Sequence, residues 1–110
     1  MFNMAEIMIT NTDSITDKKV VQILGIVKGN TVRTRNIGRD IGAGFKTLIG
    51  GEIKSYTEMI SQARDESYNR MVNQAIDLRA DAVINVRFMT SAVMQGASEL
   101  LAYGTAVKLK

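Results

Sequence analysis

The stretch 55–79, SYTEMISQARDESYNRMVNQAIDLR, decides the fold. Apolar and small side chains recur in it every three to four positions, and no glycine or proline interrupts it, which predicts one amphipathic helix about 35 Å long. Ser55, followed three residues later by Glu58, is typical of a capping box at the start of a helix. The stripe predicted to face the core contains Tyr56, Ile60, Ala63, Ser67, Met71, Gln74 and Leu78, widened by Met59, Tyr68, Val72, Ala75 and Ile76.

Extended segments flank this helix on both sides, rich in β-branched and aliphatic residues. Gly29-Asn30 is predicted to be a turn or a bulge, and Gln95-Gly96 a turn. Gly25 and Gly104 lie inside extended segments, where glycine indicates a bulge or a close approach of another backbone. The predicted strands are Met4–Thr10, Val20–Val27, Thr31–Thr34, Ala82–Met89 and Glu99–Leu109.

The order of these elements predicts an α+β fold of two layers, a βαββ unit with one long helix on a small sheet and short extra strands for assembly. Residues 1–110 are short enough to form a single domain. The helix connects two strands of the sheet as a crossover. The final hairpin is expected to extend that sheet.

A single helix is too narrow to cover a four-stranded sheet, yet the second face of the strands is predicted to be apolar. Identical copies that cover one another are the simplest solution, and a ring that continues the sheet from copy to copy would also remove exposed edges. The residues assigned to this uncovered face are Val21, Ile23, Val27, Val83, Met89, Leu100, Ala102 and Ala106.

Composition excludes several classes of site. The 110 residues include no cysteine and no histidine, which removes disulfides, thiolate zinc sites and Cys or His nucleophiles. The net charge is +3 without a polybasic run, and aromatic residues make up 5%, so no nucleic-acid partner is expected. No apolar run could span a bilayer and no signal segment is evident, so we expect a cytoplasmic protein without a membrane partner.

The candidate site is the glycine-rich segment 36–52, NIGRDIGAGFKTLIGGE, with the arginines that precede it. Backbone N–H groups and guanidinium groups together suit phosphate or carboxylate, so the segment is a candidate anion pocket beside the helix N-terminus. The alternative is structural: the arginines pair with Asp40, Glu52 or a neighbouring subunit. The acidic residues of the helix (Glu58, Asp65, Glu66 and Asp77) are interpreted as a solvated face. The candidate ligand-binding residues are Arg33, Arg35, Asn36, Arg39, Asp40 and Glu52.

Four stretches, GNTVRT (29–34), NIGRDIGAG (36–44), GGE (50–52) and AYGTA (102–106), resemble the YbjQ-like family, and the resemblance covers nearly the whole chain. It implies a fold like that of the dodecin subunit and a homopentameric ring. The family's label is heavy-metal binding, and no catalytic residue is carried over from it. No metal ligand is assigned here, because soft metals favour Cys, His and Met, and the methionines Met59, Met71, Met89 and Met94 fall at core-facing or strand-pairing positions.

The leading functional hypothesis is a non-enzymatic, oligomeric binding protein that holds a small anionic ligand or a metal near segment 36–52. A second hypothesis is an enzyme whose Arg39 and Asp40 meet Glu52 or Tyr56 of another subunit at an interface. A third is heavy-metal binding, as the family label implies. No hydroxyl nucleophile has an evident base beside it, no catalytic residue is assigned, and the sequence identifies no cofactor.

Overall fold

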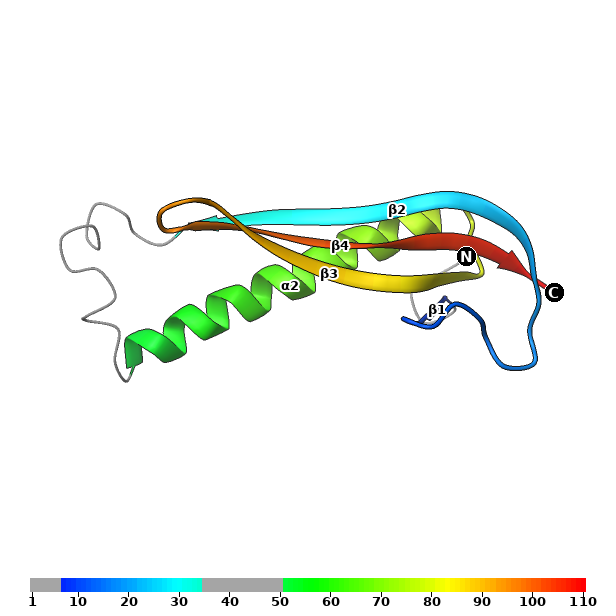
Figure 1. Ribbon diagram of the computed structural model, residues 1–110, viewed down its shortest axis with the longest axis horizontal. Coiled ribbons are helices and arrows are strands. Elements are labelled where there is room, and N and C mark those ends of the chain that lie inside the picture. Colours follow the sequence, from blue (N-terminus) through cyan, green and yellow to red (C-terminus); the bar gives the residue numbers. More distant parts are fainter. Residues whose placement is uncertain (1–6, 35–50) are drawn as a thin grey trace.

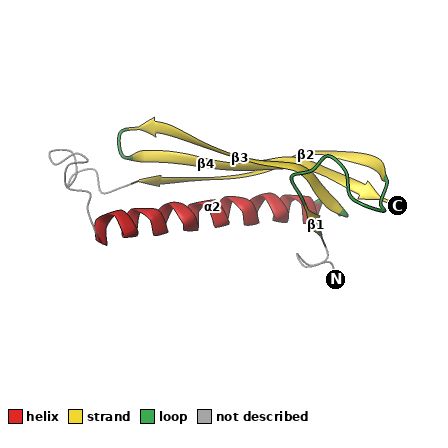
Figure 2. Ribbon diagram, turned by 60° about the horizontal axis from the view of Figure 1, so that its bottom comes forward, coloured by secondary structure: helices red, strands yellow, loops and turns green. Residues whose placement is uncertain are grey.

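The computed structural model describes residues 7–34 and 51–110, and for residues 51–53 the backbone alone. These residues form one long helix that packs along one face of a four-stranded sheet, in an elongated molecule 56 Å long (Figures 1 and 2). The predicted α+β, two-layer architecture is therefore confirmed. No helix among the described residues is both long and apolar enough to cross a membrane. The elements are β1 (Met8–Ile9), β2 (Val20–Thr34), α2 (Gly51–Asp77), β3 (Ala82–Met94) and β4 (Ala97–Leu109).

The strands are ordered β1-β3-β4-β2 in the sheet. β4 is antiparallel to both of its neighbours, and the short β1 is parallel to β3. The βαββ order of β2, α2, β3 and β4 agrees with the sequence, but the final hairpin does not simply extend the sheet. Instead β4 inserts between β2 and β3, so the two strands that α2 connects run parallel without touching.

Helix α2 begins at Gly51, one turn before the predicted capping box, so the assignment of Ser55 as its N-cap was wrong. The helix ends at Asp77 rather than at Arg79. Arg79 takes a left-handed conformation (φ 61°), and its N–H donates to the carbonyl of Ile76 at 2.9 Å. The N–H of Ala80 donates to the carbonyl of Ala75 at 3.1 Å, which completes a Schellman motif and satisfies the last carbonyls of the helix.

A close seam joins α2 to β2 at Gly29. A Cβ atom at this position would lie 2.2 Å from the carbonyl oxygen of Ser67 and 2.5 Å from the amide nitrogen of Met71. The predicted turn or bulge at Gly29-Asn30 was therefore wrong: β2 continues through it in regular register, with Gly29 paired to Ala102, and the glycine allows the close approach of the helix.

Two buried hydroxyl groups add polar contacts to this seam. Thr31 Oγ1 donates to the carbonyl of Ala63 at 2.9 Å, and Ser67 Oγ donates to the carbonyl of Leu100 at 3.0 Å. The two hydroxyl oxygens lie 2.8 Å apart. Since both side chains are almost fully buried, these bonds connect helix, β2 and β4 with no unpaired polar side-chain atom.

Bulges change which face each strand residue occupies. Gly25 has a φ of 132° beside a shift in the β2–β4 register, which confirms the predicted bulge. A second bulge lies at Asn85 (φ 54°), opposite the tightly packed Gly104. It overturns the simple alternation predicted for Ala82–Met89, because Val83 and Val86 both pack in the helix-side core. Ala82 and Ile84 belong to a separate cluster with Val107.

The bulges also correct the predicted uncovered face. Val21, Ile23 and Met89 are exposed, as expected. The other five, Val27, Val83, Leu100, Ala102 and Ala106, are buried. Gln74 and Leu78, predicted on the buried stripe of the helix, are exposed because the contact with the sheet centres on Ala63, Ser67, Met71, Val72 and Ala75.

The helix covers only part of the sheet. It packs on β2 and β4 and hardly touches β3. From Arg87 to Met94 every residue of β3 is exposed. The uncovered apolar surface thus exists, but it lies along the outer half of one strand rather than across a whole face.

We expect Gly29→Ala to lower the free energy of unfolding by about 3 kcal/mol or more, because the added methyl group overlaps helix backbone that cannot yield locally. Lys28→Ala, at the neighbouring exposed position, should change it by less than about 0.5 kcal/mol. Urea unfolding followed by circular dichroism measures both. Equal stability of the Gly29→Ala protein and its parent would contradict the close seam.

Arg79→Gly should raise the free energy of unfolding by roughly 0.5–1 kcal/mol, because glycine takes the left-handed conformation of Arg79 without the steric cost of a Cβ atom. Thermal unfolding should show a higher midpoint. Arg64→Gly, in the interior of α2, is the control and should lower stability by about 1 kcal/mol. A loss of stability with Arg79→Gly would argue against the left-handed cap.

Candidate functional site

The structure places two of the six candidate ligand-binding residues. Arg33 lies near the end of β2, and Glu52 lies in the first turn of α2, with its side chain outside the described part. Gly51 and Glu52, predicted to precede the helix, lie inside its first turn. Arg35, Asn36, Arg39 and Asp40 lie outside the described residues, so the anion pocket stays a prediction.

Arg33 belongs to a three-residue ion cluster between β2 and α2. Its Nη2 contacts Oε2 of Glu66, and Nη2 of Arg70 contacts Oε1 of the same carboxylate. Arg70 Nη1 also donates to the carbonyl of Asn30 at 2.6 Å. The three side chains are between one third and about half exposed. One carboxylate thus holds two guanidinium groups, and the cluster keeps one surplus positive charge.

This cluster corrects the sequence interpretation in two respects. The partner of Arg33 is Glu66, which was not among the partners considered for it, and Glu66 is not simply part of a solvated face. The spacing of Glu66 and Arg70 is the i,i+4 arrangement that lets opposite charges meet on a helix, so that half of the cluster was visible in the sequence. The ion pair between Arg33 and Glu66 forms only because β2 lies against α2, and no local sequence pattern encodes that packing.

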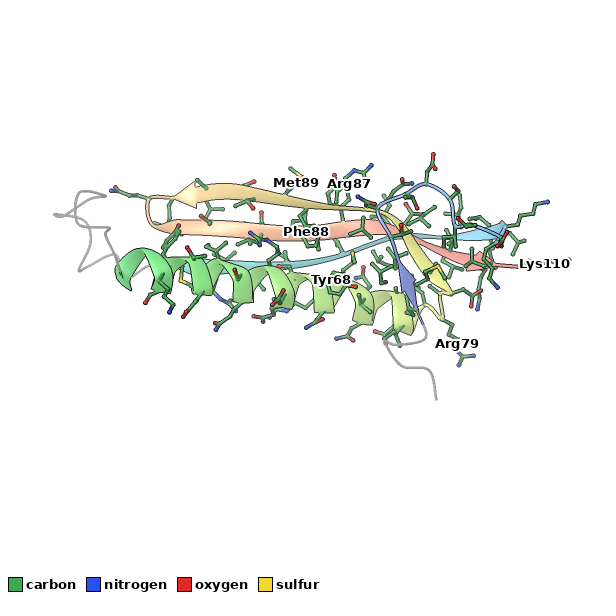
Figure 3. All side chains as sticks on the ribbon, turned by 90° about the horizontal axis from the view of Figure 1, so that it is seen from below. Tyr68, Arg79, Arg87, Phe88, Met89 and Lys110 are labelled. Atoms are coloured by element: carbon green, nitrogen blue, oxygen red, sulfur yellow. The ribbon has the colours of Figure 1, made fainter. Side chains whose placement is uncertain are left out.

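A separate open hollow of about 480 Å³ lies between helix α2 and the middle of β3, beside the residues that end β1 and follow it. Tyr68 and Phe88 face the space between helix and sheet, whereas Arg87 and Met89 lie on the other side of the sheet (Figure 3). Arg87 Nη1 donates to the carbonyls of Asn11 and Val86, both at 3.1 Å. The hollow therefore has aromatic side chains in its lining, and the bonds of Arg87 connect β3 to the segment that follows β1. Its lining is Ile9, Thr10, Asn11, Tyr68, Val86, Arg87 and Phe88.

Metal ligands do not gather in the described part of the chain. Among those side chains, no three Asp or Glu residues are grouped so as to hold an ion. Of the methionines considered as sulfur ligands, Met71 is fully buried in the core, and Met89 and Met94 lie on β3 with about half or more of their surface exposed. Met89 pairs with Leu101 and Met94 with Ala97, so both occupy strand-pairing positions, as predicted.

We expect Glu66→Gln to lower the free energy of unfolding by roughly 0.5–1 kcal/mol, a modest effect because the ion cluster is partly solvated. The loss should shrink in high salt, which already weakens the parent cluster. Asp65→Asn, one position earlier and exposed, is the matched control. Urea titrations at two salt concentrations make the measurement, and an equal effect of both substitutions would contradict a special role for Glu66.

Comparison with known proteins places the chain in a family. Residues 7–110 match the family YbjQ, described as "Putative heavy-metal-binding". The chain is 56% identical to a UPF0145 protein of Thermosipho africanus (94% of this chain, 95% of the relative) and 57% identical to one of Archaeoglobus fulgidus (96% and 97%). Its fold is similar to that of a DUF74-family protein of unknown function from Pediococcus pentosaceus, with a TM-score of 0.64 at 16% identity, over 94% of this chain and 98% of the other. The chain therefore belongs to the YbjQ family.

Proposed function

We propose that this protein is a non-catalytic binding protein that works as a ring of identical subunits. The observation that carries the proposal is the outer half of β3, where large apolar side chains are exposed on both faces of the strand. An exposed strand of this kind is a template for pairing with another chain. The residues concerned are Phe88, Met89, Val93 and Met94.

A second copy is the partner that fits this surface best, because every copy exposes the same apolar strand and would bury it on association. Large apolar side chains exposed along one short stretch of an edge strand indicate an interface. The number of subunits in the ring, five, rests on the resemblance of the sequence to the YbjQ-like family. A cytoplasmic location rests on the sequence as well, since a small chain without cysteine does not have the composition of a secreted, disulfide-stabilised domain.

The proposed ligand is a small anion, or a metal complex that carries negative charge, bound near segment 36–52. The ion cluster supports this choice, because among the described residues Arg33 and Arg70 share the single carboxylate of Glu66 and so leave a positive charge at the end of β2, where that segment begins. The helix N-terminus at Gly51 adds backbone donors where the same segment ends in the sequence. A ligand there would be bound by the residues that the sequence marked and by this cluster.

Light scattering after size-exclusion chromatography tests the assembly. At micromolar concentration we expect one species with a mass of several chains, and five if the resemblance holds for this chain, because exposed strands and apolar side chains associate at low concentration. A species of one chain's mass at all concentrations would contradict the proposal.

Calorimetric titration with inorganic phosphate and pyrophosphate tests the ligand class. Binding should weaken at least several-fold in Arg39→Ala and should be unchanged in Arg79→Ala, which lies at the other end of the helix. Titrations with copper, zinc, nickel and cadmium ions run beside these. Heat from a bare metal ion and none from either anion would replace the anion hypothesis with the metal-binding one.

A further inference from the structure

The two edges of the sheet differ in how their backbone groups are satisfied. Within an antiparallel sheet, alternate residues of an edge strand turn their N–H and C=O groups outward. In the second half of β2 these residues are Lys28, Asn30 and Val32. Their β4 partners direct their own backbone groups toward β3, so the backbone groups of these three residues point away from β4. By the same alternation, Phe88, Thr90 and Ala92 turn their backbone groups outward from β3.

Side chains block the second half of the β2 edge. The N–H of Lys28 donates to Oε1 of Gln74 at 2.8 Å, and the carbonyl of Asn30 accepts from Arg70 at 2.6 Å. The carbonyl of Val32 accepts from Arg33 at 3.4 Å. Side chains of helix α2 and of the ion cluster therefore occupy one outward group of each of these three residues and stand where a further strand would have to lie.

The β3 edge has the opposite pattern. Its first half is covered, because β1 pairs with Ala82 and Val83, and the N–H groups of Asn85 and Val86 donate to the carbonyls of Thr12 and Thr10. Beyond Val86, no backbone bond from the described residues reaches the outward groups of this strand. The outer half of β3, residues 87–94, is an open half-edge.

The first half of β2, residues 20–26, is the other open half-edge, since no described residue bonds to its outer side. The two open half-edges lie at opposite ends of the sheet. Arg87, where one begins, pairs with the same β4 residue as Lys28, which lies beyond the other; Ile26, where the other ends, pairs with the same β4 residue as Ile84, which lies in the covered half of β3. The large exposed apolar side chains concentrate on these two halves, with Val21, Ile23 and Ile26 on one and Phe88, Met89, Val93 and Met94 on the other.

We propose that residues 87–94 of one copy dock on residues 20–26 of a second copy, strand to strand. This inference rests on the proposed function and adds its contact. The occupant is a second copy because the chain itself carries both halves, each open, apolar and of similar length. Docking requires an offset of about seven residues along the strands, or roughly 23 Å. Such a contact joins unlike surfaces, and contacts of this kind form a ring when the rotation from copy to copy closes on itself.

Proline scanning of the edges tests the contact. Thr90→Pro removes an outward N–H without removing a bond to β4, so the mass by light scattering should fall to that of one chain. Val32→Pro makes the same change on the blocked half of β2 and should leave the assembled mass unchanged. Ile23→Lys and Val32→Lys form a second pair with the same expectation, and circular dichroism confirms that each variant is folded.

Cysteine cross-linking identifies the partner strand, because the parent chain has no cysteine. A mixture of Ile23→Cys and Met89→Cys proteins, treated with a short bis-maleimide, should give cross-linked dimers. Neither variant alone should, and neither should Met89→Cys mixed with Val32→Cys.

The outcomes separate the two proposals. A monomeric parent protein would overturn both. An assembled parent that survives Thr90→Pro and Ile23→Lys, or that dissociates only with the Val32 variants, would overturn this contact and leave the ring standing.

Discussion

The close seam between α2 and β2 at Gly29 is the constraint on which the rest of the structure depends. With no side chain at Gly29, the backbone of the helix at Ser67 and Met71 approaches the strand directly. This approach fixes the helix over β2 and β4, because Thr31 and Ser67 hydrogen-bond across it to helix and strand carbonyls. A helix held there cannot also cover β3, which extends past Val86 with both faces exposed.

The same position of the helix determines the chemistry of the edges. Gln74 and Arg70 reach the outer groups of β2 only because α2 lies along that strand. Glu66 then holds Arg33 and Arg70 together at the end of β2, where segment 36–52 begins. The position of α2 over β2 therefore determines four features together. They are the packing of the core, the protection of one sheet edge, the exposure of the other, and the surplus positive charge next to the start of segment 36–52.

Much of this could be predicted from the sequence, where the signal is periodic and local. The long helix, the bulge at Gly25, the hairpin turn at Gln95-Gly96 and the two-layer architecture follow from spacing and glycine placement. The predicted helix start was wrong because Ser55 and Glu58 match a capping motif, and glycine is a poor helix former, so no local pattern places Gly51 inside the helix. The position of β4 between β2 and β3 depends on long-range pairing that no local pattern encodes. The bulge at Asn85 reversed the predicted faces of β3 because a single extra residue inverts the alternation. For the candidate site, the sequence analysis named Arg33 but not its ion cluster. The four-residue spacing of Glu66 and Arg70 is a local signal that could have found half of the cluster, while the contact between Arg33 and Glu66 appears only when β2 and α2 pack.

Backbone amide hydrogen exchange tests the central claim most directly, which is that helix placement leaves β3 to be completed by another copy. In the protein at micromolar concentration, the outward amides of Phe88, Thr90 and Ala92 should exchange slowly, close to the rate of the paired amides of Arg87 and Met89. They should exchange faster on dilution below the concentration at which the assembly dissociates. Fast exchange of these three amides at every concentration, at the rate of an unpaired edge strand, would contradict the account.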